Sequence, residues 1–441
     1  MDTPRPVTEG QRRFGRLTDA YQCTHCGYCL RVCPTYRSEN TEAQSPRGRV
    51  SIVLAFMEGR ISPKETGMIL SSCLGCRACH RACPAGVSVG KLVLLSRTYA
   101  RVNKPWPVKL FHWITDRDSL SRPVARTIHW YQQSPWRKTL RAQTWLMNNR
   151  MLRHLDTLIP ENHPGIEHTE SPTQAQGDPL RAALLCGCMG RLFYPTIRTS
   201  TTALLNALGV QLTVLEGFGC CGAPHREGGD RHAFLRQARK VLDAFRPWAD
   251  KVEIILCDSA TCRITVLSYA RALAGDPRYA TLGRQFSEKT VNITDFFSQR
   301  LIGHPPPLPH PGSQRIAFFD HCQTRHESVI MNGLRKLNAA LGTGWMELPA
   351  SDQCCGAGGD TMLAHRRLSE RIRSEKLKAI EMSGTDCIVG TNPGCLLNIE
   401  AGLKAVHSPV IVRHLVEILW ESWRFGNKKP ESVTNAEEGG P

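Results

Sequence analysis

The sequence predicts an α+β protein of several domains, in which a small α-helical head is followed by two tandem α/β units. Three observations support this fold class. Eight of the 19 cysteines lie in two dense motifs between residues 23 and 84. A sparser cysteine pattern occurs twice in the rest of the chain. Around that pattern, short apolar runs alternate with amphipathic stretches, which is typical of parallel sheets covered by helices.

The composition is that of a globular protein with a basic surface. The chain has 441 residues, of which 41% are hydrophobic and 22% charged, and this length suits roughly two to four domains. The net charge of +17 favours an anionic partner, although solubility alone would explain the same excess. No nucleic-acid-binding motif is recognisable, so we expect no nucleic acid among the partners.

The cysteine content indicates metal binding in a reducing compartment. Disulfide scaffolds are usually short secreted chains behind signal peptides, whereas the first 22 residues here are polar and lack an apolar signal region. No run approaches the roughly 20 apolar residues that a membrane-spanning helix needs. We therefore expect a cytoplasmic protein whose thiols bind metal.

Composition divides the chain into six segments. Two linker-like stretches help to place the boundaries, TESPTQAQGDP at 169–179 and the proline-rich HPPPLPHPG at 304–312. The expected segments are a polar lead-in (1–22), a cysteine-dense head (23–100), a basic, tryptophan-rich helical linker (101–180), a first cysteine-rich domain (181–303), a second cysteine-rich domain (304–425) and a disordered tail (426–441).

Both dense motifs share the spacing C-x2-C-x2-C-x3-C-P. They read CTHCGYCLRVCP at 23–34 and CLGCRACHRACP at 73–84. In bacterial ferredoxins, a short loop with this spacing gives three thiolates to one [4Fe–4S] cluster, and the fourth cysteine binds the other cluster. The motifs therefore predict a ferredoxin-like head with two [4Fe–4S] clusters. The predicted ligands are Cys23, Cys26, Cys29 and Cys83 for the first cluster, and Cys73, Cys76, Cys79 and Cys33 for the second.

Two other interpretations of the dense motifs are weaker. Cysteines that serve as small buried hydrophobic residues explain one or two of them, but not eight in matched spacing. Zinc sites usually combine two C-x2-C pairs and lack the third close cysteine. Between the motifs, Arg47 and Arg49 could stabilise cluster charge, but we expect each of them to be solvated.

An internal repeat occupies the remainder of the chain. RAALLCGCMGR (181–191) resembles RIAFFDHCQTR (315–325), and GFGCCGAPHREGGD (217–230) resembles SDQCCGAGGD (351–360). Cys188 precedes the first cysteine of its Cys-Cys-Gly by 32 positions, Cys322 does the same in the second copy, and the copies are offset by 134 positions. Such self-similarity indicates two copies of one structural unit.

Each copy is expected to be a small α/β domain with a parallel sheet. The Cys-Cys-Gly motifs would then lie in loops after strands, where α/β sheets place their ligands. The predicted strands are 182–187, 211–216 and 252–257 in the first copy, and 315–319 and 387–391 in the second. The predicted helices are 196–209 and 230–245 in the first copy, and 326–342 and 367–384 in the second.

The repeats supply a second set of candidate ligands. Two adjacent thiolates that face one metal are easier to explain than a strained disulfide between neighbours. Because three distant pieces of chain must converge, such a site forms only when the domain folds. The four thiols of each copy could hold a further iron–sulfur cluster or zinc. They are Cys188, Cys220, Cys221 and Cys262 in the first copy, and Cys322, Cys354, Cys355 and Cys395 in the second.

No motif for another redox cofactor or for a catalytic residue is present. The chain has no strand-associated G-x-G-x-x-G and no P-loop. Four histidines lie beside cysteines (His25, His80, His225 and His321), and we expect them to form hydrogen bonds or face solvent rather than bind metal. A chain with clusters and no two-electron cofactor is expected to conduct electrons rather than to oxidise a substrate.

The chain resembles the iron–sulfur subunits of glycolate oxidase and their kin, which include lactate-utilisation proteins, the anaerobic glycerol-3-phosphate dehydrogenase anchor subunit and heterodisulfide reductase. The resemblance covers about residues 20–425 and is carried by both dense motifs, SPRGR, CCGAPHREGGD, CCGAGGD and TNPGCLLNI. It implies a partner dehydrogenase subunit that contains FAD and oxidises glycolate, lactate or a similar 2-hydroxy acid. It further implies that this chain passes the electrons to a quinone or membrane acceptor.

One departure from the family pattern favours electron transfer over a reductase function. The fullest pattern ends each cysteine-rich domain in C-x-x-C, which gives a fifth thiolate for a non-cubane cluster, but Ser259 and Asn392 stand at those positions. The alternative function, a heterodisulfide or thiol reductase, usually needs that cysteine and is therefore less favoured. Cys257 and Cys387 lie just upstream and could substitute for it, whereas Cys186 is expected in the core.

The composition of the linker is informative about whether the electron acceptor lies at a membrane. Residues 106–154 combine nine basic and two acidic side chains with five of the nine tryptophans. This combination suits peripheral contact with the inner face of the cell membrane. Alternatively, the tryptophans pack between the head and the repeats. They are Trp106, Trp113, Trp130, Trp136 and Trp145.

Overall fold

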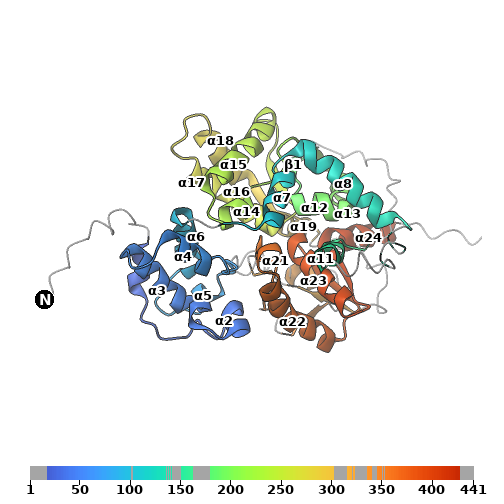
Figure 1. Ribbon diagram of the computed structural model, residues 1–441. Coiled ribbons are helices and arrows are strands. Elements are labelled where there is room, and N and C mark those ends of the chain that lie inside the picture. The colour runs from blue at the N-terminus through green and yellow to red at the C-terminus, as the bar shows by residue number, and fades with distance from the viewer. Residues whose placement is uncertain are drawn as a thin grey trace, which may run out of the picture.

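The protein consists of a helical head, linker helices and two α/β domains that lie against each other (Figure 1). No helix among the described residues is both long and apolar enough to cross a membrane. The computed structural model describes residues 17–427, apart from 101–102, 136, 138, 140, 142–149, 162–178, 302–314, 320, 323–334, 340–344, 350 and 352.

The head is built from short helices, and its described residues contain no strand. Several of these helices begin with proline, whose fixed φ suits the first helical position. Ser45 caps the longest one by accepting a hydrogen bond from Gly48 N at 2.9 Å. Leu17 and Ala20, from the predicted lead-in, are buried in the head core. The elements are η1 (Thr18–Gln22), α2 (Pro34–Glu39), η2 (Glu42–Gln44), α3 (Pro46–Met57), α4 (Pro63–Leu70), α5 (Ala78–Arg81) and α6 (Val89–Tyr99).

The first α/β domain contains four parallel strands in the order β2-β1-β3-β4. Residues 182–185 of the central strand β1 are fully buried, as expected for a strand covered on both faces. The strands are β1 (Arg181–Leu185), β2 (Gln211–Val214), β3 (Ile254–Cys257) and β4 (Thr290–Asn292). The helices are α12 (Cys188–Phe193), α13 (Pro195–Ala207), α14 (Ala223–Glu227), α15 (Arg231–Phe245), η3 (Arg246–Trp248), α16 (Ala260–Leu267), α17 (Tyr269–Ala272), α18 (Ala280–Lys289) and α19 (Ile293–Leu301).

The second α/β domain repeats this topology. Its four parallel strands have the order β6-β5-β7-β8, so β5 occupies the place of β1 and β7 that of β3. The strands are β5 (Ile316–Phe318), β6 (Met346–Glu347), β7 (Cys387–Gly390) and β8 (Ile411–His414). The helices among its described residues include α21 (Thr361–Ala364), α22 (Arg366–Ser383), α23 (Pro393–Ala405) and α24 (Leu415–Asn427).

The predicted fold class is confirmed, and all five predicted strands are present. Three edge strands, β4, β6 and β8, were not predicted, because runs of two to four residues show no periodicity. Of the predicted helix 326–342, only 335–339 are described, and they are helical. Both linker-like stretches lie outside the described residues, except Pro179. Helix α24 continues two residues into the predicted tail, and the rest of the tail lies outside the described residues.

The two α/β domains share one hydrophobic core. Helix α24, at the end of the second domain, packs against α13 of the first domain. Trp420 on α24 is 2% exposed and belongs to the same buried cluster as Leu184 and Phe297 from the first domain and Ile388 from the second. The second domain therefore completes the packing of the first.

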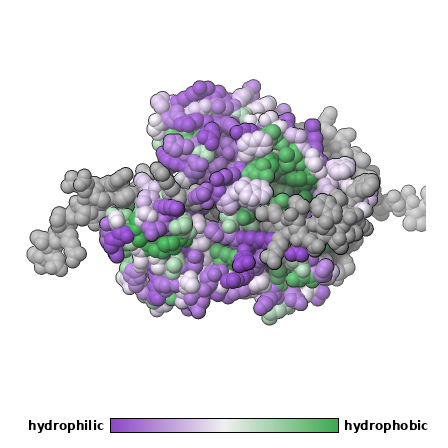
Figure 2. Space-filling model, viewed as in Figure 1, coloured by the Kyte–Doolittle hydropathy of each residue, from purple (hydrophilic) through white to green (hydrophobic). Residues whose placement is uncertain are grey.

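The linker helices α7 (Trp106–Thr115), α8 (Asp118–Gln133) and α11 (Arg150–Leu158) run across both domains. Helix α8 packs on α12, and α11 packs on α23. Trp106, Trp113 and Trp130 are 59%, 50% and 63% exposed, so the expectation that the tryptophans pack between head and repeats is wrong for these three. Figure 2 shows apolar surface gathered over α7 and the start of α8. The side chains at 136 and 145 lie outside the described ones.

Candidate metal centres

The two cysteine-dense loops of the head have the same backbone shape. In each loop, the residues on both sides of the second cysteine adopt a positive φ. Such left-handed residues turn the chain sharply, and a tightly curled loop fits three thiols around one cluster. The matched spacing in the sequence therefore corresponds to matched geometry. The residues are His25 and Gly27 around Cys26, and Gly75 and Arg77 around Cys76.

Cys33, from the first motif, lies near thiols of both motifs. Burial and the negative charges of Cys73 and Cys33 raise the pKa of the Cys79 thiol to about 12, which places these sulfurs near one another. Burial, with Cys23 and Cys33, also raises the pKa of Cys29. Thiols that resist deprotonation in this way are held as thiolates by a cation such as cluster iron. The donor set fits two clusters, and the individual ligand assignments stay predictions.

Arg49 is buried beside the second predicted cluster, so the expectation that it is solvated is wrong. It is 2% exposed, and its Nη1 lies 3.8 Å from Cys33 Sγ. Its Nη2 donates a hydrogen bond to Ser72 Oγ at 3.2 Å. A buried cation favours thiolates and raises the reduction potential of a neighbouring cluster. Arg47 stays partly exposed and donates to the carbonyl oxygen of His25 at 3.2 Å.

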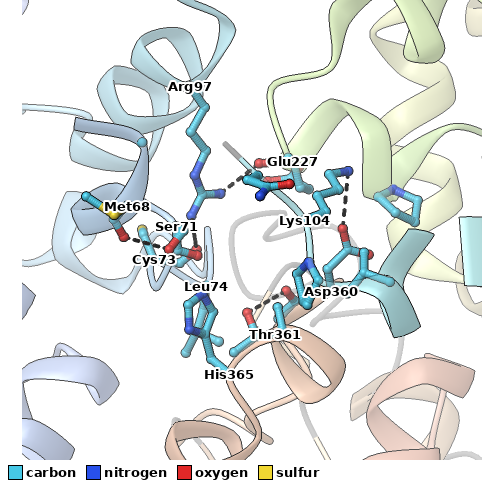
Figure 3. Close-up of a pocket in the computed structure, with 18 of the residues that line it drawn as sticks. Met68, Ser71, Cys73, Leu74, Arg97, Lys104, Glu227, Asp360, Thr361 and His365 are labelled. Atoms are coloured by element: carbon cyan, nitrogen blue, oxygen red, sulfur yellow. Dashed lines mark hydrogen bonds and ion pairs between the residues drawn. The ribbon is translucent and has the colours of Figure 1, made fainter. Parts of the chain in front are cut away.

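A second buried arginine, Arg97 on α6, was missed by the sequence analysis. Its Nη2 donates to the carbonyl oxygen of Leu70 at 2.5 Å. Nη2 also donates to those of Ser71 (3.0 Å) and Cys73 (2.8 Å), and Nη1 donates to that of Glu227 (2.7 Å) in the first α/β domain (Figure 3). The guanidinium thus fixes the loop that carries Cys73 and joins it to that domain. The sequence signal was weak, because α6 also carries a second basic residue, Lys91, which is exposed.

In the first α/β domain, the four predicted thiols form two close pairs. Cys188 Sγ lies 3.8 Å from Cys220 Sγ, and Cys221 Sγ lies 3.2 Å from Cys262 Sγ. All four are buried. The first and last of them follow β1 and β3, whose carboxyl ends meet at the same edge of the sheet. Gly222 N donates to Cys220 Sγ at 3.3 Å, a type of bond that tunes cluster potentials.

The second α/β domain repeats this pairing. Cys322 is hydrogen-bonded to Cys354, and Cys355 to Cys395. Hydrogen bonds from its two partners hold the pKa of Cys354 well below its ordinary value, while hydrogen bonding and burial raise the pKa of Cys322 and Cys355. Gly356 N donates to Cys354 Sγ at 3.4 Å, as its counterpart does in the first domain. The repeat in the sequence is thus a repeat of side-chain contacts.

Both sets of thiols face one cavity between the domains. Its volume is about 110 Å³. Within the part of the chain that the structure describes, no three His, Cys, Asp or Glu side chains converge as tightly as a single metal ion requires. Paired thiols around a shared cavity leave room for a group larger than one ion. The cavity is lined by Cys188, Cys220, Cys221, Cys262, Cys322, Cys354, Cys355 and Cys395.

The two positions that lack the fifth cysteine meet across the domain boundary. Ser259 Oγ donates to Asn392 Oδ1 at 3.3 Å, and Asn392 Nδ2 donates to Thr261 Oγ1 at 2.8 Å. Nδ2 also lies 3.5 Å from Cys395 Sγ. Ser259 and Asn392 are both buried. A hydrogen-bonded contact that joins the domains therefore takes the place of a fifth thiolate in each copy.

Asp258, directly after β3, was also missed. Its Oδ1 accepts a hydrogen bond from Gly187 N at 2.8 Å, and its backbone oxygen lies 3.1 Å from Nε2 of His414 in the second domain. Burial raises the pKa of Asp258 to about 7. The side chain orients the loop that carries Cys188. In the sequence, Asp258 could have been noticed as a single carboxylate that directly follows an apolar strand, in CDSATC (257–262).

The head and the second α/β domain bring thiols together. After burial, the negative charge of Cys354 is the largest contribution that raises the pKa of Cys76. A cavity of about 30 Å³ between the two parts is lined by Cys76, Cys322 and Cys354. The second predicted cluster and the second cysteine-rich site are therefore neighbours. Two ion pairs join the same parts, Arg37–Glu375 (2.9 Å) and Arg371–Glu39 (2.9 Å).

The three other cysteines of the repeats are buried in the domain cores. Burial raises the pKa of Cys186, Cys257 and Cys387, to about 12 for Cys387. None of these three is among the described residues that line the shared cavity. The contacts therefore give no support to Cys257 or Cys387 as a substitute for the fifth thiolate.

The histidines beside cysteines form hydrogen bonds or are exposed. His225 Nε2 lies 2.8 Å from Asp116 Oδ1. His321 Nε2 accepts a hydrogen bond from Thr391 N at 2.7 Å. The two histidines in the head, at 25 and 80, are exposed.

Comparisons with known proteins agree with this arrangement. A family model described as "4Fe-4S dicluster domain" matches residues 19–87, and one described as "Cysteine-rich domain" matches residues 182–266 and 316–400. The "Glycolate oxidase iron-sulfur subunit" of Escherichia coli (strain K12) is 28% identical over 94% of this chain and 97% of its own length.

Two proteins of Bacillus subtilis (strain 168) are similar as well. Its "Probable glycolate oxidase iron-sulfur subunit" is 28% identical over 96% of this chain and 99% of its own length. Its "Lactate utilization protein A" is 27% identical over 54% of this chain and 99% of its own length. The chain therefore combines a 4Fe-4S dicluster domain with two cysteine-rich domains, and over nearly its full length it is similar to proteins named as glycolate oxidase iron–sulfur subunits.

Proposed function

We propose that this chain is the iron–sulfur electron-transfer subunit of a flavin-linked 2-hydroxy acid dehydrogenase that acts on glycolate or lactate. A partner subunit that contains FAD oxidises the acid, and this chain passes the electrons to a quinone or membrane acceptor. The observation that carries the proposal is the row of adjoining thiol sites, in which Cys76 of the head lies next to Cys354 of the second cysteine-rich domain. The names of the relatives support the same reaction.

The residues of this chain have distinct roles in the proposal. When bound, iron–sulfur clusters accept and release single electrons. The eight cysteines of the dense motifs hold two [4Fe–4S] clusters, and Arg49 and Arg97 place buried positive charge beside the second. The N–H groups of Gly222 and Gly356 bond to sulfur in the cysteine-rich domains. The four thiols of each such domain hold a further cluster or zinc.

The complex is proposed to act at the inner face of the cell membrane through a peripheral contact. Trp106, Leu110 and Trp113 recur at helical spacing on α7 and are 59%, 45% and 50% exposed. Tryptophan suits the level of the lipid headgroups, and the basic surface of the chain suits anionic lipid. This contact would bring the electron-transfer subunit close to a lipid-soluble acceptor.

The alternative, a heterodisulfide or thiol reductase, has less support. Such chemistry usually needs the fifth thiolate in each domain. Ser259 and Asn392 occupy those positions and are hydrogen-bonded to each other. Reduction of a heterodisulfide by the purified chain would favour this alternative over electron transfer.

Metal and sulfide counts on anaerobically purified protein test the proposal. The head alone should bring about eight iron atoms, four in each cluster. Cys221→Ser and Cys355→Ser each remove one predicted ligand from a cysteine-rich domain, and Cys186→Ser, outside the thiol sites, is the matched control. Loss of iron in the two ligand variants indicates clusters in these domains, and loss of zinc indicates zinc sites. If the two ligand variants lose neither iron nor zinc, the thiols of the cysteine-rich domains do not hold metal. If the wild-type preparation is colourless and free of iron, the whole proposal is refuted.

The partner is tested separately. The isolated chain should not oxidise glycolate or lactate, and its clusters should be reduced only when the flavoprotein subunit and the acid are both present. Oxidation of glycolate by the isolated chain would contradict the proposed division of labour.

A further inference from the structure

A cavity of about 590 Å³ lies where the head, the linker and both α/β domains meet (Figure 3). Its walls come from α4 and the loop of Cys73, from the segment that leads into α7, and from α14 and α21. The volume falls within the roughly 300–1,000 Å³ that is typical of small-molecule sites. Apart from Cys73, no predicted metal ligand among the described residues lines it.

Most charged groups of this cavity are already paired or hydrogen-bonded. Lys104 Nζ lies 3.4 Å from Asp360 Oδ2, and Asp360 Oδ1 lies 2.8 Å from His112 Nε2. Arg97 donates to four carbonyl oxygens, and Lys64 is exposed, where water screens its charge. A paired interior gives little attraction to a carboxylate. The cavity therefore favours an uncharged ligand over a 2-hydroxy acid.

Among the partly buried side chains of the cavity, His365 is left for a ligand. Its partly buried ring makes no hydrogen bond with any residue that the structure describes. Burial, together with the positive charge of Arg97, lowers its pKa, so the neutral ring offers one donor and one acceptor at pH 7. Figure 3 shows it beside Leu74. Apolar side chains, including Leu74, Val108 and Ala364, line the space around it.

The cavity adjoins the exposed apolar face of the linker. Residues 103–105 and 108 form one wall, and the same helix exposes Trp106, Leu110 and Trp113. Met68, which also lines the cavity, is 60% exposed and marks its opening. A lipophilic ligand would therefore find apolar surface from the proposed membrane contact to the cavity.

We propose that this cavity binds the ring of a quinone next to Cys73, a predicted ligand of the second cluster. An uncharged ring with two carbonyl acceptors matches the apolar walls and the N–H of His365. Its isoprenoid tail would leave along α7. The inference rests on the proposed electron-transfer function, and it adds the location and the chemical class of the acceptor.

Equilibrium dialysis of the full-length, cluster-containing chain tests this site. The probes are a benzoquinone and a naphthoquinone with fully substituted rings and one isoprene unit, because such rings do not add to thiols. Ala364→Phe fills the cavity and should weaken binding at least about tenfold. His365→Leu removes the donor at similar volume and should weaken binding roughly fivefold. The exposed controls Met382→Phe and His232→Leu should bind as the wild type does.

Iron content and the paramagnetic spectrum are measured for every variant, so that loss of clusters is separated from loss of the ligand. Should Ala364→Phe lose its clusters, His365→Leu decides alone. Three results would overturn the site. The cavity variants could bind quinone as well as the controls do, glycolate could displace the bound quinone, or the intact wild type could fail to bind quinone. Quinone binding at the cavity, without cluster reduction by the flavoprotein and 2-hydroxy acid, would instead overturn the proposed function and leave the site standing.

Discussion

Replacing Arg97 by methionine should loosen both the second cluster loop and its junction with the first α/β domain. The guanidinium donates to the carbonyl oxygens of Leu70, Ser71, Cys73 and Glu227 over 2.5–3.0 Å. Hydrogen bonds to a charged group contribute about 1.5–3 kcal/mol each. The cost of burying the cation, which also lowers the pKa of Arg97, offsets part of this sum. We therefore expect the free energy of unfolding to fall by about 3–5 kcal/mol.

Two further variants separate hydrogen bonding from charge. Arg97→Lys keeps the positive charge but cannot reproduce the planar fork that reaches several carbonyl groups. Both Arg97 variants should lose stability in anaerobic urea unfolding followed by circular dichroism. Only the methionine variant should lower the potential of the second cluster, measured by redox titration with paramagnetic resonance. Arg271→Met, at an exposed position on α17, is the control and should change neither quantity.

Two results would refute this reasoning. If Arg97→Met unfolds at the same urea concentration as the wild type, the four hydrogen bonds do not stabilise the junction. If Arg97→Lys lowers the cluster potential as much as Arg97→Met does, the buried charge is not what sets it.

Two further predictions concern pH and the membrane. Burial raises the pKa of Asp258 from 3.8 to about 7. The protonated side chain therefore stabilises the fold fully below pH 3.8, and this stabilisation is lost as the pH rises to 7. The free energy of unfolding should decline by up to about 4 kcal/mol over this range. Asp258→Asn should flatten this decline in urea unfolding between pH 5 and 7.5, and an unchanged slope would assign it to other groups. Replacing Trp106 and Trp113 by serine should reduce flotation with anionic vesicles, whereas the exposed control Met382→Ser should not. A wild-type chain that never floats would exclude the membrane contact.

The parts of the molecule that were predictable from the sequence are those set by local spacing or by repetition. The intervals between the head cysteines predicted two equivalent loops, and positive φ values recur at the same places in both. The offset of 134 residues predicted two like domains, and both sheets have the same strand order. Runs of buried residues such as 182–185 predicted the inner strands, because a strand covered on both faces is apolar throughout.

The parts that were not predictable depend on which distant segments meet. Arg49 and Arg97 look like ordinary basic residues until the fold places them against Cys33 and the Cys73 loop. Ser259 was recognised only as a missing cysteine. Its hydrogen bond to a residue 133 positions away arises from the packing of the two domains, and no local pattern encodes that packing.

The contact between α24 and α13 sets the order in which the chain can mature. Helix α13 (Pro195–Ala207) leaves the ribosome 220 residues before α24 (Leu415–Asn427), its cover in the finished molecule. Until synthesis ends, the first cysteine-rich domain lacks part of its apolar lining, and a nascent chain at that stage needs protection from aggregation. If the thiols of that domain hold metal as proposed, the metal would be delivered after translation, and a truncated product without the last helix would be a poor acceptor for it.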